Sequence, residues 1–175
     1  MKYIFVLFFL CINTVLADVA PESIEAPTFE LPTLTGDNIV RLEDYKNQVV
    51  YLDFWASWCA PCRRSLPMIN ELRKELHSQG FEVLAVNLDE SPDMGLSFVE
   101  PLNLTYPLLY DGFGKTPNSY QVRAMPTSFL IDHTGQVRSM HVGFSPDTIE
   151  SVRQDVLELL KKIPRNSAEI SQNNP

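Results

Sequence analysis

Two apolar runs, residues 48–55 and 81–88, limit the possible folds of this chain more than any other feature. Both are rich in β-branched and aromatic residues, which is typical of strands buried on both faces of a parallel sheet. Between them, over residues 60–79, leucine and isoleucine recur at helical spacing, and Gly80 supplies a helix stop. The pattern therefore predicts a right-handed βαβ unit.

Turn and helix-start signals place the other elements around this unit. Pairs of apolar segments separated by short Gly-containing turns predict hairpins, and Ser-Pro-Asp predicts the start of a helix. The resulting order predicts a mixed α/β sheet with helices on both faces. We expect a hairpin over 29–40, a helix from 92 that stops before 101, a short extended segment at 106–110, a short helix at 116–120, a hairpin over 127–142 and a last helix from 146.

The first residues have the three-part layout of a secretory signal peptide. Lys2 supplies a positive charge, residues 3–12 are apolar, and residues 15–17 form a small-residue cleavage site. The alternative is a short uncleaved anchor, which would associate the protein with a membrane. We favour cleavage because a membrane-spanning helix needs about 20 apolar residues. The expected location of the mature protein is periplasmic or otherwise extracytoplasmic.

The rest of the chain is long enough for one domain and too short for two ordinary ones. We expect a signal peptide or anchor at 1–17, a flexible lead-in at 18–25, one domain at 26–163 and a disordered tail at 164–175. The net charge of −8 argues against nucleic acid as a partner, because binding nucleic acid requires a basic surface.

Cysteine usage indicates redox chemistry. Of three cysteines, Cys11 lies in the signal segment, which leaves only Cys59 and Cys62. A disulfide between them would close too short a loop to add much stability. They stand where the first buried strand gives way to the helix, whose N-terminus stabilises a thiolate. We therefore expect Cys59 to attack a substrate disulfide and Cys62 to resolve the mixed disulfide.

A structural metal site is the alternative use of this pair. Zinc in structural sites takes four protein ligands, and Cys59 and Cys62 supply only two. The three histidines are far from the pair in the sequence. We expect no metal and no bound cofactor.

Three segments of the chain resemble the TlpA/ResA type of thiol–disulfide oxidoreductase in the thioredoxin superfamily. Residues 54–67 read Phe-Trp-Ala-Ser-Trp-Cys-Ala-Pro-Cys-Arg-Arg-Ser-Leu-Pro, which is similar to the active-site segment of that group. Residues 26–42, beginning Ala-Pro-Thr-Phe and ending Arg-Leu, resemble its N-terminal extension, and residues 125–132 resemble its cis-proline segment. The resemblance implies a thioredoxin-like fold with an N-terminal β-hairpin extension.

The resemblance also implies a client-binding surface around the cysteines. The Met125–Pro126 bond would be cis and face the pair, so that the Met125 backbone can pair with an extended client segment. From the residues alone, an ordinary trans proline at the start of a strand is the alternative. Trp58, beside the attacking cysteine, and Pro61, within the pair, are the other expected client contacts.

Two carboxylates are candidates for proton transfer. Asp53 lies in a buried strand, where loss of hydration raises a carboxyl pKa towards neutrality. Its position matches the buried aspartate of thioredoxins, which helps to deprotonate the resolving cysteine, although the TlpA/ResA group often has a neutral residue there. Glu90 matches the active-site glutamate of that group, and a solvated loop acid is the alternative. This sequence holds both carboxylates.

The resemblance implies that the protein reduces disulfides of client proteins, for example in cytochrome c maturation, and is recharged by a membrane-embedded electron donor. One rival is a disulfide oxidase or isomerase of the same fold. Many proteins of that class have a histidine between the cysteines, where this chain has Ala60 and Pro61. The other rival is a non-catalytic module that binds or delivers a protein.

Overall fold

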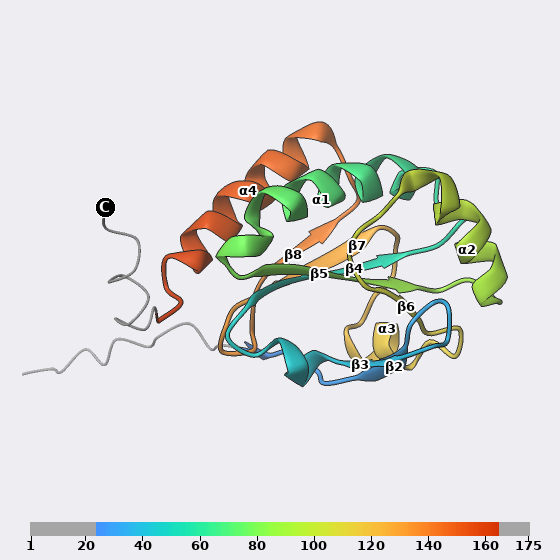
Figure 1. The fold of residues 1–175 in the computed structure, drawn as a ribbon, viewed down its shortest axis with the longest axis horizontal. Helices are drawn as coiled ribbons and strands as arrows, with labels where there is room; N and C mark the ends of the chain where they lie inside the picture. Colours follow the sequence, from blue (N-terminus) through green and yellow to red (C-terminus); the bar gives the residue numbers. More distant parts are fainter. Residues whose placement is uncertain (1–23, 165–175) are drawn as a thin grey trace, which may run out of the picture.

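The computed structural model describes residues 24–164 (Figure 1). The elements are β1 (Ile24–Glu25), β2 (Glu30–Pro32), β3 (Ile39–Arg41), a 3₁₀ turn (Leu42–Tyr45), β4 (Val49–Trp55), α1 (Cys62–Leu76), a 3₁₀ turn (His77–Gln79), β5 (Phe81–Asn87), α2 (Pro92–Val99), a 3₁₀ turn (Glu100–Leu102), β6 (Leu108–Tyr110), α3 (Lys115–Ser119), β7 (Thr127–Ile131), β8 (Gln136–Val142) and α4 (Pro146–Leu160).

The elements form a six-stranded mixed sheet in the order β1-β8-β7-β4-β5-β6. Strand β4 runs parallel to β5, and β5 runs parallel to β6, whereas β7 pairs antiparallel with β4 and β8 antiparallel with β7. Every residue of β4 and of β5 is buried. The predicted βαβ unit and the mixed sheet are therefore confirmed.

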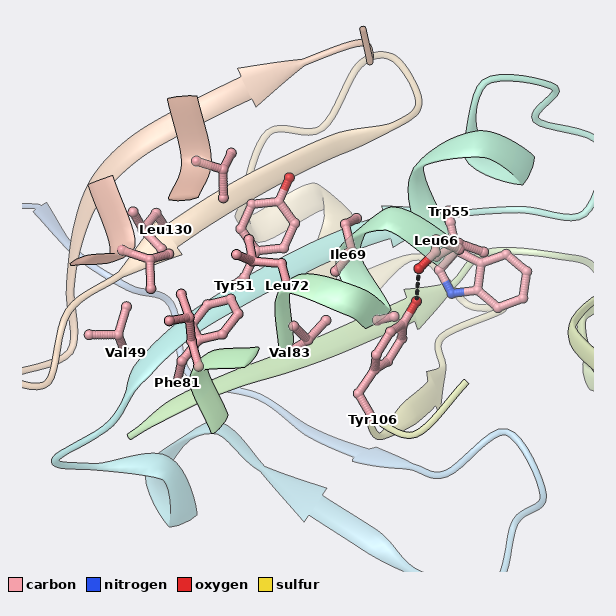
Figure 2. Close-up of a cluster of buried hydrophobic side chains, with 14 of the residues drawn as sticks. Val49, Tyr51, Trp55, Leu66, Ile69, Leu72, Phe81, Val83, Tyr106 and Leu130 are labelled. Carbon is pink, nitrogen blue, oxygen red and sulfur yellow. Dashed lines mark hydrogen bonds between the residues drawn. The ribbon is translucent and has the colours of Figure 1, made fainter. Parts of the chain in front are cut away.

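Helices and a hairpin cover the two faces of this sheet. In Figure 1, α1 and α4 lie along one face, while α3 and the β2–β3 hairpin lie on the other. Alternate residues of β4 point into two separate cores, because successive side chains of a strand face opposite ways. Tyr51 and Trp55 pack under α1 with Leu66 and Ile69 (Figure 2), and Leu52 packs on the hairpin side.

The N-terminal hairpin is tied to the far edge of the main sheet. Strands β2 and β3 pair antiparallel, with Leu31 opposite Val40, which confirms the predicted hairpin. Thr33 forms an isolated bridge with Leu109 of β6, and the Leu34 N–H donates to the Leu108 carbonyl at 2.7 Å. The hairpin thus protects the free edge of β6 as well as covering the sheet face.

The sheet begins two residues before the domain boundary expected at residue 26. Ile24 and Glu25, assigned from the sequence to a flexible lead-in, form β1 and pair with Val137 and Gln136 of β8. The Ala26 N–H continues the contact by donating to the Gly135 carbonyl at 2.9 Å. These two residues therefore belong to the domain, and the lead-in assignment is wrong for them.

The expected signal peptide at 1–17, the rest of the lead-in and all but the first residue of the expected tail lie outside the described residues. Within residues 24–164, no helix has both the length and the apolar character needed to cross a membrane.

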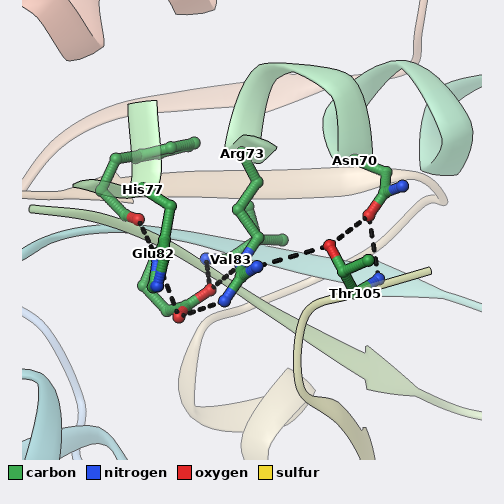
Figure 3. Close-up of polar contacts among 7 residues, drawn as sticks. Asn70, Arg73, His77, Glu82, Val83 and Thr105 are labelled. Carbon is green, nitrogen blue, oxygen red and sulfur yellow. Dashed lines mark hydrogen bonds and ion pairs between the residues drawn. The ribbon is translucent and has the colours of Figure 1, made fainter. Parts of the chain in front are cut away.

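A buried ion pair fastens the last turns of α1 to the start of β5 (Figure 3). The Arg73 guanidinium donates to both carboxylate oxygens of Glu82, at 2.5 and 3.0 Å, and the Val83 N–H donates to Glu82 Oε1 at 2.8 Å. Asn70 and Thr105 extend the same network. The buried Glu82 charge is therefore fully partnered, as the low dielectric of the interior requires.

We predict that Glu82→Gln lowers the free energy of unfolding by about 3 kcal/mol, because it leaves the largely buried Arg73 without a counter-charge. Glu71→Gln is the matched control, since the exposed Glu71–Lys74 pair should contribute under about 0.5 kcal/mol. Urea unfolding of both variants measures the difference. Equal effects in the two variants would contradict the assigned role of the buried pair.

Candidate active site

The two cysteines lie at the junction of β4 and α1. Strand β4 ends at Trp55, Cys59 sits in the turn that follows, and Cys62 is the first residue of α1. The two sulfurs are bonded at 2.05 Å, and the Cα atoms are 5.3 Å apart. The Cys62 N–H donates to Cys59 Sγ at 3.3 Å. The helix N-terminus therefore directs a hydrogen-bond donor at the sulfur that would carry the negative charge of a thiolate.

The two cysteine residues differ in exposure in the expected sense. Cys59 is 4% exposed and Cys62 is 0% exposed, so Cys59 is the one that a partner can reach first. Trp58, next to it, is 65% exposed although it is a large apolar side chain. Pro61 is half-buried. The surface around the pair thus offers an apolar contact beside a nearly buried sulfur.

The Met125–Pro126 peptide bond is cis, which confirms the bond geometry that the resemblance implied. Pro126 is buried, and its carbonyl accepts a hydrogen bond from the Gly143 N–H at 2.8 Å. Met125 packs against the buried cluster that contains both Cys59 and Cys62. The cis-proline loop and the cysteine pair therefore border the same core.

Asp53 lies on β4 in the sheet core, with 1% of its surface exposed. Its Oδ2 atom has no hydrogen-bond partner among the described residues. Burial raises the pKa of Asp53 to about 8. The burial of Asp53 that the sequence predicted is therefore confirmed, and a carboxyl with this pKa changes its protonation state near neutral pH.

Tyr51 and Tyr106 lie in the core under α1 (Figure 2) and are close enough to Asp53 for its charge to act on them. The Tyr51 hydroxyl is 2.6 Å from Ser128 Oγ, and the Tyr106 hydroxyl donates to the Leu66 carbonyl at 3.2 Å. Burial and then the charge of Asp53 raise the pKa values of both tyrosines. Both hydroxyls therefore stay protonated at neutral pH, and of these three groups only Asp53 changes its protonation state near neutral pH.

Glu90 and its neighbour Asp89 differ sharply in their surroundings. The Glu90 side chain is exposed, and its backbone carbonyl accepts a hydrogen bond from the Tyr110 hydroxyl at 3.0 Å. Asp89 is 1% exposed, and its carboxylate accepts hydrogen bonds from Ser57, in the turn that carries Cys59. Asp89 was not among the residues predicted from the sequence. Two adjacent acids after a buried strand were the available signal, but they do not show which one turns inwards.

Arg63, adjacent to the pair, points its guanidinium over the Phe98 ring, 4.7 Å from the ring centroid. Among residues 24–164, no group of three or more His, Cys, Asp or Glu side chains is arranged to hold a metal ion.

A mixed sheet with a redox-capable Cys-x-x-Cys pair at the start of the first long helix, beside a cis-proline loop, defines the class of thioredoxin-like thiol–disulfide oxidoreductases. The chain belongs to the AhpC/TSA family, which it matches over residues 24–140.

Named relatives within this class agree with the site. The thiol-disulfide oxidoreductase ResA of Geobacillus thermodenitrificans is 40% identical over 136 residues, which cover 78% of this chain and 76% of that protein. A Chlorobium tepidum structure assigned as the thiol:disulfide interchange protein DsbE is 44% identical, with a TM-score of 0.75 over 79% of this chain and 96% of that chain. An exposed lipoprotein thioredoxin from Streptococcus pneumoniae is 34% identical, with a TM-score of 0.64 over 78% and 99% of the two chains. These relatives confirm the resemblance, and the protein is a thiol–disulfide oxidoreductase.

The raised pKa of Asp53 makes stability depend on pH. In the unfolded chain this carboxyl titrates near 3.8, and in the folded protein near 8. Between these values the folded state keeps a proton that the unfolded state has lost, so the free energy of unfolding falls as pH rises and levels off above pH 8.

We predict that Asp53→Asn removes this contribution. Between pH 5 and pH 7.5 the free energy of unfolding of the parent should fall by about 2 to 3 kcal/mol relative to the variant. Urea unfolding of the oxidised proteins at the two pH values measures the difference. If the free energies of unfolding of the parent and of the variant changed equally between these pH values, Asp53 would be ionised in the folded protein throughout this range.

Proposed function

We propose that this protein reduces disulfides of client proteins outside the cytoplasm, with Cys59 as the attacking sulfur and Cys62 as the resolving one. The observation that carries the proposal is the placement of the pair: Cys59 is the more exposed residue of the two, and the first N–H of α1, which also donates to the Cys59 carbonyl, donates to the Cys59 sulfur. No other cysteine follows the signal segment in the sequence, so the pair is the only dithiol of the mature chain.

The reaction exchanges two electrons and two protons. The Cys59 thiolate attacks one sulfur of the client disulfide, which breaks that bond, and the other client sulfur leaves as a thiolate and takes up a proton. Cys62 then gives its proton to a base and attacks Cys59 Sγ, which releases the second client thiol and oxidises the pair. A membrane-embedded dithiol donor returns two electrons and two protons to the pair.

Asp53 is the proposed base for the second step. It lies between Tyr51 and Trp55 on β4, which face the core that contains Cys62, and successive side chains of a strand alternate between faces. With a pKa of about 8, a minor fraction of Asp53 is ionised near pH 7, and this fraction takes the proton. Glu90, exposed at the end of β5, is the second candidate and would act through solvent. No bound cofactor is required, because the sulfur pair itself carries the electrons.

The client would bind across Trp58, Pro61, Met125 and Pro126. The exposed Trp58 ring supplies apolar contact area beside Cys59. The Met125 backbone, next to the cis bond, would pair with an extended client segment as an added strand. This mode of recognition uses backbone groups and therefore accepts many client sequences.

Export is supported by the signal-peptide layout of residues 1–17 and by the exposed lipoprotein relative. Within that location, we propose cytochrome c maturation as the task, following the TlpA/ResA resemblance. The corresponding client chemistry is the Cys-x-x-Cys-His haem-attachment segment, which must be reduced before haem can be joined to it.

A disulfide-bonded peptide containing Cys-x-x-Cys-His, mixed with the reduced protein, tests this function. We predict stoichiometric reduction of the peptide by the parent and none by Cys59→Ser. Cys62→Ser should stop at a mixed disulfide through Cys59, visible by mass spectrometry. If the oxidised protein instead converts the reduced peptide to the disulfide at equilibrium, the oxidase alternative replaces the reductase.

The rate at which the same peptide is reduced shows which of the two carboxylates contributes more to proton transfer. We predict that Asp53→Asn slows reduction near pH 7 by at least about tenfold, because it removes the buried proton acceptor for Cys62. Glu90→Gln should slow it less. The reverse ranking in a pH series of reduction rates would transfer the role of proton acceptor to Glu90.

A further inference from the structure

The Asp89 carboxylate joins the end of β5 to the turn that carries Cys59. The Ser57 N–H lies 3.1 Å from Oδ1 and 3.0 Å from Oδ2, and the Ser57 hydroxyl donates to Oδ1 at 2.9 Å. The Asn87 amide donates to Oδ2 at 2.7 Å. Every one of these contacts is a donor, which suits a carboxylate because it only accepts hydrogen bonds.

Asp89 is also fixed to the end of β5. The Asn87 side chain is fully buried against Gly95 of α2, where an added Cβ would lie 2.9 Å from Asn87 Cγ. Asn87 Oδ1 also accepts the Asp89 N–H at 3.2 Å. Next to them, the Leu88 N–H donates to the Trp55 carbonyl at 2.9 Å. The carboxylate is thus tied through Asn87 to the end of β5, which packs against α2 at Gly95.

We propose that Asp89 is a positioning residue for disulfide exchange, whose carboxylate holds the turn from Ala56 to Cys59 and so keeps the Cys59 sulfur at the start of α1. The path is short: Asp89 binds Ser57, and the Cys59 N–H donates to the Ala56 carbonyl at 3.0 Å. The inference rests on the proposed function, in which Cys59 is the attacking sulfur. Asp89 touches neither sulfur according to the hydrogen bonds of the described residues, so it acts through the turn.

The hydrogen bonds between Asp89 and Ser57 restrain Cys59 more in the reduced protein than in the oxidised protein. In the oxidised protein the bond to Cys62 already restrains Cys59. In the reduced protein that bond is absent, so Cys59 is restrained by the contacts of the turn and by its packing in the core. Loss of the hydrogen bonds to Asp89 therefore frees the reduced state more than the oxidised state, and the gained conformational entropy favours the dithiol. The reduction potential should rise, because the effective concentration of Cys59 at Cys62 falls.

Asp89→Asn tests the proposal. The variant replaces one accepting oxygen with a donating amide group among donors from Ser57 and Asn87, which breaks at least one of the anchoring contacts. In equilibrium with glutathione, we expect the constant for forming the Cys59–Cys62 disulfide to fall about tenfold, a rise in potential of about 30 mV. Asp93→Asn, which removes an exposed charge from the start of α2, is the matched control and should keep the parent value.

Ser57→Ala decides the question if Asp89→Asn does not fold. It removes only the hydroxyl contact to Oδ1, and we expect a fall of about threefold in the same constant. If Asp89→Asn folds and has the reduction potential of the parent, the inference is overturned. If Asp89→Asn does not fold, a Ser57→Ala variant with the reduction potential of the parent overturns it. Failure of the parent to form the disulfide at all would instead overturn the proposed function.

Discussion

The central position of β4 is the constraint on which the site depends. This strand pairs with β5 on one side and β7 on the other, and its side chains fill both cores. A shift of one residue would turn Leu52 and Phe54 from one core into the other, so the register is strongly specified. The end of β4 at Trp55 is therefore fixed, and with it the turn that places Cys59 at the start of α1.

The same sheet buries two carboxylates in opposite ways. At one end Glu82 has Arg73 as a bidentate partner, and its charge contributes to holding α1 on β5. Asp53, in the middle of β4, has no counter-charge and an oxygen without a partner among the described residues. Leaving a buried acid unpaired costs stability, and such groups cluster at functional sites because their pKa values suit proton transfer. The contrast separates a carboxylate held in an ion pair from one that, in the proposed function, moves a proton.

The sequence predicted most of the fold because its signals are local. Apolar runs marked β4 and β5, helical spacing marked α1, and a Gly-containing turn marked the β7–β8 hairpin. Strand β1 was missed because its two residues carry no periodic pattern of their own, and only the pairing with β8 defines it.

For the site, the Cys-x-x-Cys spacing marked the cysteine pair, and the apolar run around Asp53 predicted that its carboxyl is buried, as the structure confirms. The cis bond at Pro126 followed only from the resemblance, since local sequence favours a trans proline. Asp89 was missed because its partner Ser57 lies on the turn after another strand, and a contact between two loops leaves no trace in a single sequence.

The reduction potential of the Cys59–Cys62 couple, measured against a glutathione series on residues 18–175, tests the central claim most directly. A value near or below about −250 mV would place the protein with reductants such as thioredoxin at about −270 mV, and this is the result we predict. A value near −120 mV, where strong oxidants lie, would contradict the assigned direction of electron flow.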